Sequence, residues 1–193
     1  MSRSALIVID AQESFRHRPY WSETDLSAYI DRQQALIDGC LARGVPVVQI
    51  FHVEEQGVFS LASGYVRALE ELSIAPDVVF HKHMHSALAG TPLAAWLTAR
   101  EINRLIVSGI RTEQCCETTT RHASDSGFGV EYVSEATLTF AMTHPGSGRT
   151  YTPQEIRERT ELVLEGRFAR ISTVAEVLAA IDAARESREP VAG

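Results

Sequence analysis

The stretch ALIVID, residues 5–10, is a short apolar run, rich in β-branched residues, that ends at an acidic residue. A continuous apolar run of this kind is typical of a strand that is buried on both faces of a parallel sheet. Further short apolar runs predict strands at 45–51, 78–80, 105–108, 130–133 and 168–171. The chain therefore offers about six candidate strands for one sheet.

Segments with helical periodicity alternate with these runs. Their apolar spacing predicts helices over 26–42, 65–72, 92–99, 118–126, 154–165 and 173–184. Gly44 and Gly127 follow two of these helices as stop signals, and Thr152 with Glu155 forms a capping box before another. Alternation of strand and helix predicts a doubly wound, Rossmann-like α/β domain: a three-layer α/β/α sandwich around a mostly parallel sheet.

Composition limits the possible functions. The 193 residues carry a formal net charge of −7, with 45% hydrophobic and 22% charged residues, which fits one globular domain over 1–193. We expect the tail, 186–193, to be frayed. The chain has no basic stripe for nucleic acid and no apolar window near the roughly 20 residues of a membrane span. We expect a soluble, cytoplasmic protein whose partners are small molecules or other proteins.

The three cysteines, Cys40, Cys115 and Cys116, form no disulfide framework. Their odd number and the adjacent pair indicate a reducing compartment, in which a thiol can act as a nucleophile. Cys40 and Cys116 are interpreted as small buried apolar residues.

Chemically active residues follow the predicted strands. Asp10 ends the first strand, His52 follows the second, Lys82 follows the third, and the stretch 109–116 follows the fourth. In doubly wound sheets ligands bind beyond the carboxyl ends of the strands. The sequence therefore predicts that an acid, a base, a cation and a thiol meet at one edge of the sheet.

Cys115 is the candidate nucleophile. The N-terminus of the following helix and a nearby lysine both favour a thiolate, and an aspartate within reach can take the thiol proton and return it to a leaving amine. His81, His83 and His85 alternate on an extended segment and admit a metal site or contacts with substrate. The lysine between them disfavours a cation, so the metal interpretation ranks second.

Three motifs in order make the chain similar to the isochorismatase-like cysteine hydrolases, which include nicotinamidase and N-carbamoylsarcosine amidase. The motifs are LIVIDAQESF at 6–15, Lys82 followed by SAL at 86–88 and GTPL at 90–93, and GIRTEQCCETT at 109–119. The resemblance extends from residue 5 to about 181. It implies a hydrolase that cleaves the C–N bond of a small amide or N-carbamoyl compound through a thioester.

The resemblance also implies a role for each matching residue. Cys115 corresponds to the nucleophile, Asp10 to the general base and acid, and Lys82 to the cation that stabilises the thiolate. It further implies a cis peptide bond between Ile110 and Arg111. The backbone amides of Arg111 and Cys115 would then donate to the oxyanion.

Departures from the family pattern matter for metal and substrate. Nicotinamidases carry an aspartate two residues before the histidine that corresponds to His52, whereas this chain has Ile50 there, and the further family histidines do not appear in 53–65. We therefore predict no bound metal and no cofactor, and nicotinamide is disfavoured as a substrate. Isochorismatases that cleave a vinyl ether commonly lack the cysteine, so Cys115 favours amide chemistry.

The pocket and the assembly are less well determined by sequence. Position alone makes several side chains candidates for the pocket wall: Gln12, Phe15, Trp21, His52, His85 and Phe140. Arg111 or Arg16 is suited to hold a substrate carboxylate through two hydrogen bonds. Family members are commonly homo-oligomers, so we expect a homodimer or homotetramer.

Other functions remain open. The Cys115–Cys116 pair also suits a thiol-based redox sensor, although a sensor has no use for Asp10 and Lys82 as a proton shuttle. A catalytically silent relative that acts by binding is the second alternative, and a vinyl ether hydrolase is the third.

Overall fold

A computed structural model describes residues 3–187, and its centre is a six-stranded, wholly parallel sheet. The strands are β1 (Ser4–Ile9), β2 (Val47–His52), β3 (Val78–Lys82), β4 (Arg104–Ile110), β5 (Gly129–Leu138) and β8 (Arg170–Ile171). Their order is β3-β2-β1-β4-β5-β8. The chain therefore winds outward from β1 in both directions, and the predicted doubly wound sheet is confirmed.

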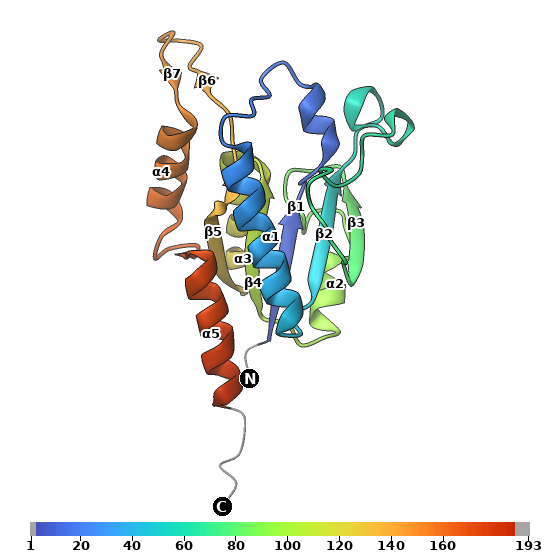
Figure 1. Cartoon of the computed structure of the whole chain (residues 1–193), viewed down its shortest axis with the longest axis vertical. Coiled ribbons are helices and arrows are strands. Elements are labelled where there is room, and N and C mark those ends of the chain that lie inside the picture. The colour runs from blue at the N-terminus through green and yellow to red at the C-terminus, as the bar shows by residue number, and fades with distance from the viewer. Residues whose placement is uncertain (1–2, 188–193) are drawn as a thin grey trace, which may run out of the picture.

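Helices cover both faces of the sheet (Figure 1). They are α1 (Leu26–Ala42), α2 (Leu93–Thr98), α3 (Glu117–Asp125), α4 (Pro153–Leu164) and α5 (Val174–Glu186). Buried side chains of α1 and α5 pack in one apolar core, and those of α2, α3 and α4 pack in a second core on the opposite face. This is the three-layer sandwich that the sequence predicts. Within residues 3–187 no helix is long and apolar enough to cross a bilayer.

The alternation of β1 explains how one strand serves both cores. Leu6 and Val8 point into the core under α1, whereas Ile7 and Ile9 point into the core under α2, and all four side chains are fully buried. Burial of one such side chain contributes roughly 1.5–3 kcal/mol. The first strand therefore holds the two layers together, and it fixes where the chain leaves the sheet at Asp10.

Helix boundaries agree closely with local sequence signals. Helix α1 spans the predicted 26–42, and Gly44 follows it with φ +66°. The predicted capping box of α4 is present: the Thr152 side chain accepts from the backbone of Glu155, and the Glu155 side chain accepts from the backbone of Thr152. A second capping box, Thr173 with Glu176, begins α5.

The helix predicted over 65–72 is wrong. This segment runs alongside the chain that follows β1, and Ala68 forms an antiparallel bridge with Gln12. The backbone amide of Leu69 donates to the carbonyl of Ala11 at 3.0 Å, and Leu69 is 1% exposed. Pairing with a segment more than fifty residues away therefore satisfies the backbone groups that a helix would have paired locally.

Irregular elements account for the remaining differences. Short 3₁₀ turns lie at η1 (Glu13–His17), η2 (Gly57–Phe59) and η3 (Leu61–Ser63). A small antiparallel hairpin, β6 (Met142–Thr143) and β7 (Thr150–Tyr151), extends beyond α4 at the upper edge in Figure 1. Most of the tail predicted to fray lies outside the described residues, and Glu186 is the last residue of α5.

Candidate active site

Asp10, Lys82 and Cys115 meet at the carboxyl edge of the sheet. Asp10 follows β1, Lys82 ends β3, and Cys115 lies in η4 (Thr112–Cys116), a turn of π-helix between β4 and α3. The backbone of Asp10 has φ +50°, in the left-handed region that few non-glycine residues adopt. The chain therefore turns sharply as it leaves β1, at the point where it delivers a carboxylate.

Lys82 is the centre of the cluster. Its Nζ lies 2.7 Å from Asp10 Oδ2, 3.4 Å from Cys115 Sγ and 3.3 Å from His52 Nδ1. The side chains of Lys82 and Asp10 are both 0% exposed. Burial disfavours the charged ammonium, but the Asp10 carboxylate and the Cys115 sulfur outweigh burial and raise the pKa of Lys82. The lysine is therefore a fixed positive charge that joins the acid to the thiol.

The surroundings of Cys115 favour the thiol over the thiolate. Burial raises the pKa of Cys115 to about 12, the negative charge of Asp10 acts in the same direction, and the charge of Lys82 opposes them. This result differs from the thiolate that the helix position and the lysine predict. The physical reason is that Cys115 is only 7% exposed, which the sequence does not reveal. A thiolate would form here only if a nearby base took the thiol proton, and the Asp10 carboxylate is held beside the thiol by Lys82, which lies near both.

His52 and Gln12 form a supporting pair beside the lysine. Gln12 Oε1 accepts from the backbone N–H of His52 at 2.8 Å, and Gln12 Nε2 donates to the His52 carbonyl at 3.1 Å and to Ser14 Oγ at 2.9 Å. Gln12 is fully buried, so both ends of its amide are used inside the protein rather than at a pocket wall. Burial and then the charge of Lys82 lower the pKa of His52, which favours a neutral ring that accepts from Nζ.

The turn that carries Cys115 is anchored on β5. Thr112 Oγ1 lies 2.8 Å from Thr137 Oγ1, the Tyr132 hydroxyl donates to the Thr112 carbonyl at 2.8 Å, and the Thr139 hydroxyl donates to Glu113 Oε2 at 2.5 Å. Thr112 and Glu113 begin the turn that follows β4, and their partners lie in β5 or directly after it. These hydrogen bonds therefore fix the position of the turn that carries Cys115 relative to the sheet.

The predicted cis peptide bond between Ile110 and Arg111 is present. Just before it, Gly109 has φ +124°, and a Cβ built there would lie 1.9 Å from the carbonyl oxygen of Ile9. Only glycine fits at this position, where β4 runs beside β1 in the sheet. Within residues 3–187 the backbone N–H of Arg111 donates to no other group, as an oxyanion donor requires.

The aromatic candidates lie in two separate groups. Phe15 packs edge-on against Phe59, with ring centroids 5.1 Å apart, and Phe59 also contacts the His52 ring. Trp21 packs against Phe140, with centroids 5.2 Å apart. Phe59 was not among the predicted pocket residues, and the sequence offers no signal for it because it comes from an irregular loop.

The three histidines around Lys82 have different neighbours, and His81 lies within β3 whereas His83 and His85 follow it. His85 is exposed, and its ring lies parallel to the His52 ring at 6.4 Å between centroids. His83 Nδ1 lies 2.9 Å from the Val53 carbonyl, and His81 contacts Phe51. The strand ends at Lys82, so the alternation that the spacing predicts stops there. No three His, Cys, Asp or Glu side chains within residues 3–187 are arranged to hold a metal, and metal-free function stays a prediction.

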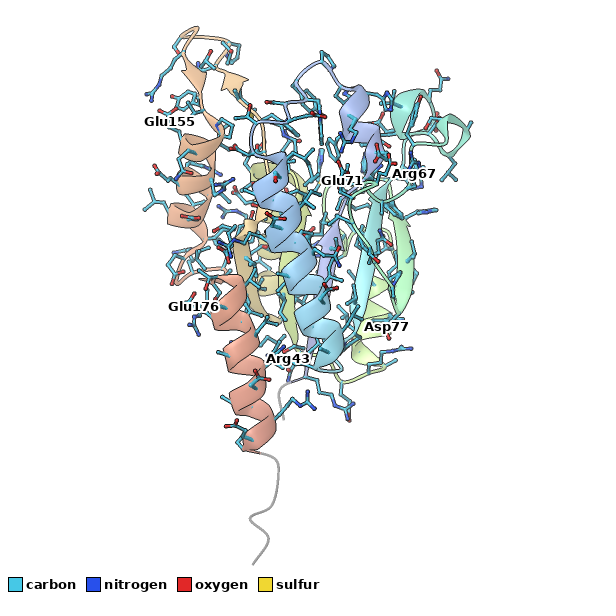
Figure 2. All side chains as sticks on the ribbon, viewed as in Figure 1. Arg43, Arg67, Glu71, Asp77, Glu155 and Glu176 are labelled. Carbon is cyan, nitrogen blue, oxygen red and sulfur yellow. The ribbon has the colours of Figure 1, made fainter. Side chains whose placement is uncertain are left out.

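The two arginine candidates differ sharply. Arg16 forms ion pairs with Glu13, Glu23 and Glu71, and Glu71 is labelled in Figure 2 near η1. Three acidic partners leave Arg16 little capacity for a substrate carboxylate, contrary to the prediction. Arg111 is 6% exposed and has a single acidic partner, Glu113, whose Oε1 lies 2.9 Å from Nη2.

The fold and the buried cluster define a class of protein: a three-layer α/β domain with a thiol and an aspartate–lysine ion pair at the carboxyl edge of its sheet. A family model, the isochorismatase domain, matches residues 4–147. The chain belongs to the isochorismatase family, whose members are hydrolases.

Curated relatives and solved structures agree with this assignment. The chain is 25% identical to the uncharacterised isochorismatase family protein YrdC of Bacillus subtilis, over 91% of this chain and 95% of that protein. It is 28% identical to nicotinamidase 3 of Arabidopsis thaliana, over 71% of this chain and 74% of that protein. It is 30% identical to ureidoacrylate amidohydrolase RutB of an Enterobacter species, over 66% of this chain and 52% of that protein. The solved structure of a cysteine hydrolase from Pseudomonas syringae superposes with a TM-score of 0.85 at 25% identity, over 94% of this chain and 93% of that one.

Proposed function

We propose that the chain hydrolyses the C–N bond of a small amide or N-carbamoyl compound through a thioester on Cys115, without a metal. The observation that carries the proposal is the position of Lys82 Nζ, 2.7 Å from Asp10 and 3.4 Å from Cys115 in a fully buried cluster. Such a cluster unites a nucleophile, a base and a fixed positive charge, which acyl transfer requires. Two relatives with amide substrates in their names, a nicotinamidase and a ureidoacrylate amidohydrolase, support it.

In the proposed reaction Asp10 accepts the Cys115 proton as the sulfur attacks the carbonyl carbon. The backbone amides of Arg111 and Cys115 donate to the oxyanion, and one such donor is typically worth about 3–4 kcal/mol of barrier. Asp10 then protonates the departing ammonia or amine, which leaves a thioester. A water molecule that gives its proton to Asp10 attacks the thioester, and the acid and the thiol are released.

Two further observations bear on substrate and mechanism. Ile50, which stands where nicotinamidases have an aspartate ligand, is fully buried in the core of the sheet, so this position offers no ligand at the edge. Nicotinamide is therefore a disfavoured substrate in this proposal. Cys116 is 0% exposed, and burial raises its pKa well above the ordinary value. A sealed and protonated Cys116 is a poor resolving partner, which argues against the redox sensor.

Ammonia release from EDTA-treated protein, across primary amides and N-carbamoyl compounds, tests the proposal. We expect turnover that survives EDTA, vanishes in Cys115→Ala and persists in the matched variant Cys116→Ala. Activity that returns only with added zinc or iron contradicts the metal-free mechanism. Activity on a vinyl ether alone, or on no compound, moves the function to the ether hydrolase or to the silent relative.

The cytoplasmic location and the homo-oligomeric assembly are part of the same proposal. Light scattering coupled to size-exclusion chromatography separates a monomer from the expected dimer or tetramer.

A further inference from the structure

The guanidinium of Arg111 is buried in an aromatic setting beside the nucleophile turn. Its Cζ lies 4.8 Å from the centroid of the Tyr20 ring and 5.6 Å from that of Phe140. Its side chain is only 7% exposed. The Arg111 carbonyl accepts from the backbone N–H of Cys116 at 3.2 Å, so the turn that holds Cys115 also holds this arginine. Burying a cation costs free energy unless its N–H groups make hydrogen bonds, so the partners of the Arg111 guanidinium matter.

Those donors are largely unmet. Among residues 3–187 no group accepts a hydrogen bond from Arg111 Nε or Nη2, and the 2.9 Å contact of Nη2 with Glu113 Oε1 is an ion pair without hydrogen-bond alignment. The indole N–H of Trp21, which packs on the same Phe140 ring, is also buried with no acceptor among these residues. Native proteins leave few buried donors unpaired. Two side chains with unpaired donors, Arg111 and Trp21, lie against the same Phe140 ring, which indicates a missing acceptor.

The chemistry of the missing acceptor follows from the donors. A guanidinium and an indole N–H offer hydrogen atoms and no lone pair, so their partner must accept hydrogen bonds, and the positive charge favours an anion. Glu113 Oε1 lies 2.9 Å from Nη2, and the Thr139 hydroxyl donates to Glu113 Oε2. Glu113 therefore balances charge but leaves Nε and Nη2 without a hydrogen bond, which a second carboxylate would supply.

Given the proposed amide hydrolysis, we infer that Arg111 and Trp21 bind a carboxylate of the substrate. The substrate is then an amide or N-carbamoyl compound that carries an ionised acid group at its other end. Arg111 acts twice: its backbone N–H donates to the oxyanion, and its side chain selects which amides reach Cys115. Arg16 Cζ lies 5.2 Å from the centroid of the Trp21 ring, but its guanidinium is paired with three glutamates, so the inference assigns the carboxylate to Arg111.

Half-amides and diamides of the same dicarboxylic acid provide matched probes, because a carboxylate replaces an amide of the same shape. The pairs are malonamate with malonamide, succinamate with succinamide, and glutaramate with glutaramide. For the pair whose length fits, we expect kcat/KM of the half-amide to exceed that of the diamide by about ten- to a hundredfold, the usual effect of hydrogen bonds to a charged group. The difference should lie mainly in KM.

Variants assign the preference to the two side chains. In Arg111→Met the ratio of half-amide to diamide kcat/KM should fall to about one, whatever the absolute rates, and in Trp21→Phe it should fall partway. Because Arg111→Met leaves Glu113 buried and unpaired, the double variant Arg111→Met/Glu113→Gln is measured as well, with folding checked by circular dichroism. Arg100→Met is the matched control, since Arg100 stacks on Trp96 at 4.1 Å and lies away from Cys115.

The outcomes are distinguishable. A wild-type ratio near one, or a high ratio that survives in both Arg111 variants, overturns the inference and assigns the unmet donors to bound water, while amide hydrolysis stands. If the wild type hydrolyses none of the half-amides and diamides and no other amide either, the proposed function itself is contradicted. A ratio that falls equally in Arg100→Met shows a general charge effect and also overturns the role of Arg111.

Discussion

Replacing Lys82 by methionine isolates the ion pair at the centre of the site. Methionine keeps the length of the lysine side chain and removes its charge. The change leaves the Asp10 carboxylate fully buried without the ammonium that now lies 2.7 Å from Oδ2. Breaking one partner of a buried ion pair is strongly destabilising because the other charge remains uncompensated.

The size of the effect follows from that burial. Loss of one partner of such a pair costs about 3–5 kcal/mol. For a chain of this length each kcal/mol shifts the Tm by about 2–4 °C, so we expect a decrease of about 6–20 °C in Lys82→Met. In the double variant Asp10→Asn/Lys82→Met both charges are gone. We expect its free energy of unfolding to return to within about 1 kcal/mol of the wild type.

Urea unfolding followed by circular dichroism measures the four corners of this double-mutant cycle. Arg43→Met is the control: Arg43 pairs with Asp182 at 2.7 Å, but the two side chains are 26% and 45% exposed. Arg43 lies at the opposite edge of the sheet, beside the end of α1 (Figure 2). A solvent-exposed pair of this kind contributes little to stability, so Arg43→Met should unfold close to the wild type. If Lys82→Met is as stable as Arg43→Met, or if the double variant recovers nothing, the reasoning from burial is refuted.

Three further predictions concern protonation and the backbone. The rate of Cys115 alkylation by iodoacetamide should still be rising at pH 10, because burial raises the thiol pKa to about 12, and a plateau below pH 8 would contradict this. The folded-state pKa of His52 is lowered, so the unfolded chain binds more protons at low pH. The free energy of unfolding of the wild type should therefore fall as the pH drops below about 6.5. In the same urea titrations His52→Asn should lose less stability than the wild type between about pH 7 and pH 5. Gly109→Ala should destabilise by about 2–6 kcal/mol, since φ is +124° and the new Cβ would meet the Ile9 carbonyl. Gly64→Ala, at φ +76° in open space, should cost only about 1–3 kcal/mol, and equal losses in the two variants would show that the close contact is unimportant.

The order of elements could be read from the sequence because local pattern and global fold agree. A strand such as β1 must be apolar on both faces to separate two helical layers, and its residues show this directly. Helix 65–72 was mispredicted for the opposite reason. Its leucines are buried as a helix would bury them, but the backbone pairs with Ala11 and its neighbours across the fold. Such a pairing depends on where two distant segments come to lie, which composition cannot reveal.

The candidate site divides in the same way. That Asp10, Lys82 and Cys115 lie together was predictable from strand ends alone, since parallel strands bring their carboxyl ends to one edge. The protonation state of Cys115 was not, because it depends on the packing that leaves the sulfur 7% exposed. Gln12 looked like a pocket residue from its position, yet its amide holds the His52 backbone. Position along a strand predicts which edge a residue reaches but not which neighbour its side chain meets.

The high pKa of Cys115 is compatible with its proposed role because proton transfer inside the cluster conserves charge. At rest the cluster holds a thiol, a carboxylate and an ammonium; after transfer it holds a thiolate, a carboxylic acid and the same ammonium. The net charge of the cluster is zero in both states, so burial penalises them to a similar extent. Release of the proton to water, which the high thiol pKa describes, would instead leave a buried negative charge in excess. Lys82 lies within 3.4 Å of both the donor and the acceptor atoms, so it stabilises the negative charge before and after transfer. A buried thiol can therefore act as a nucleophile at neutral pH, provided that its proton moves to Asp10 rather than to solvent.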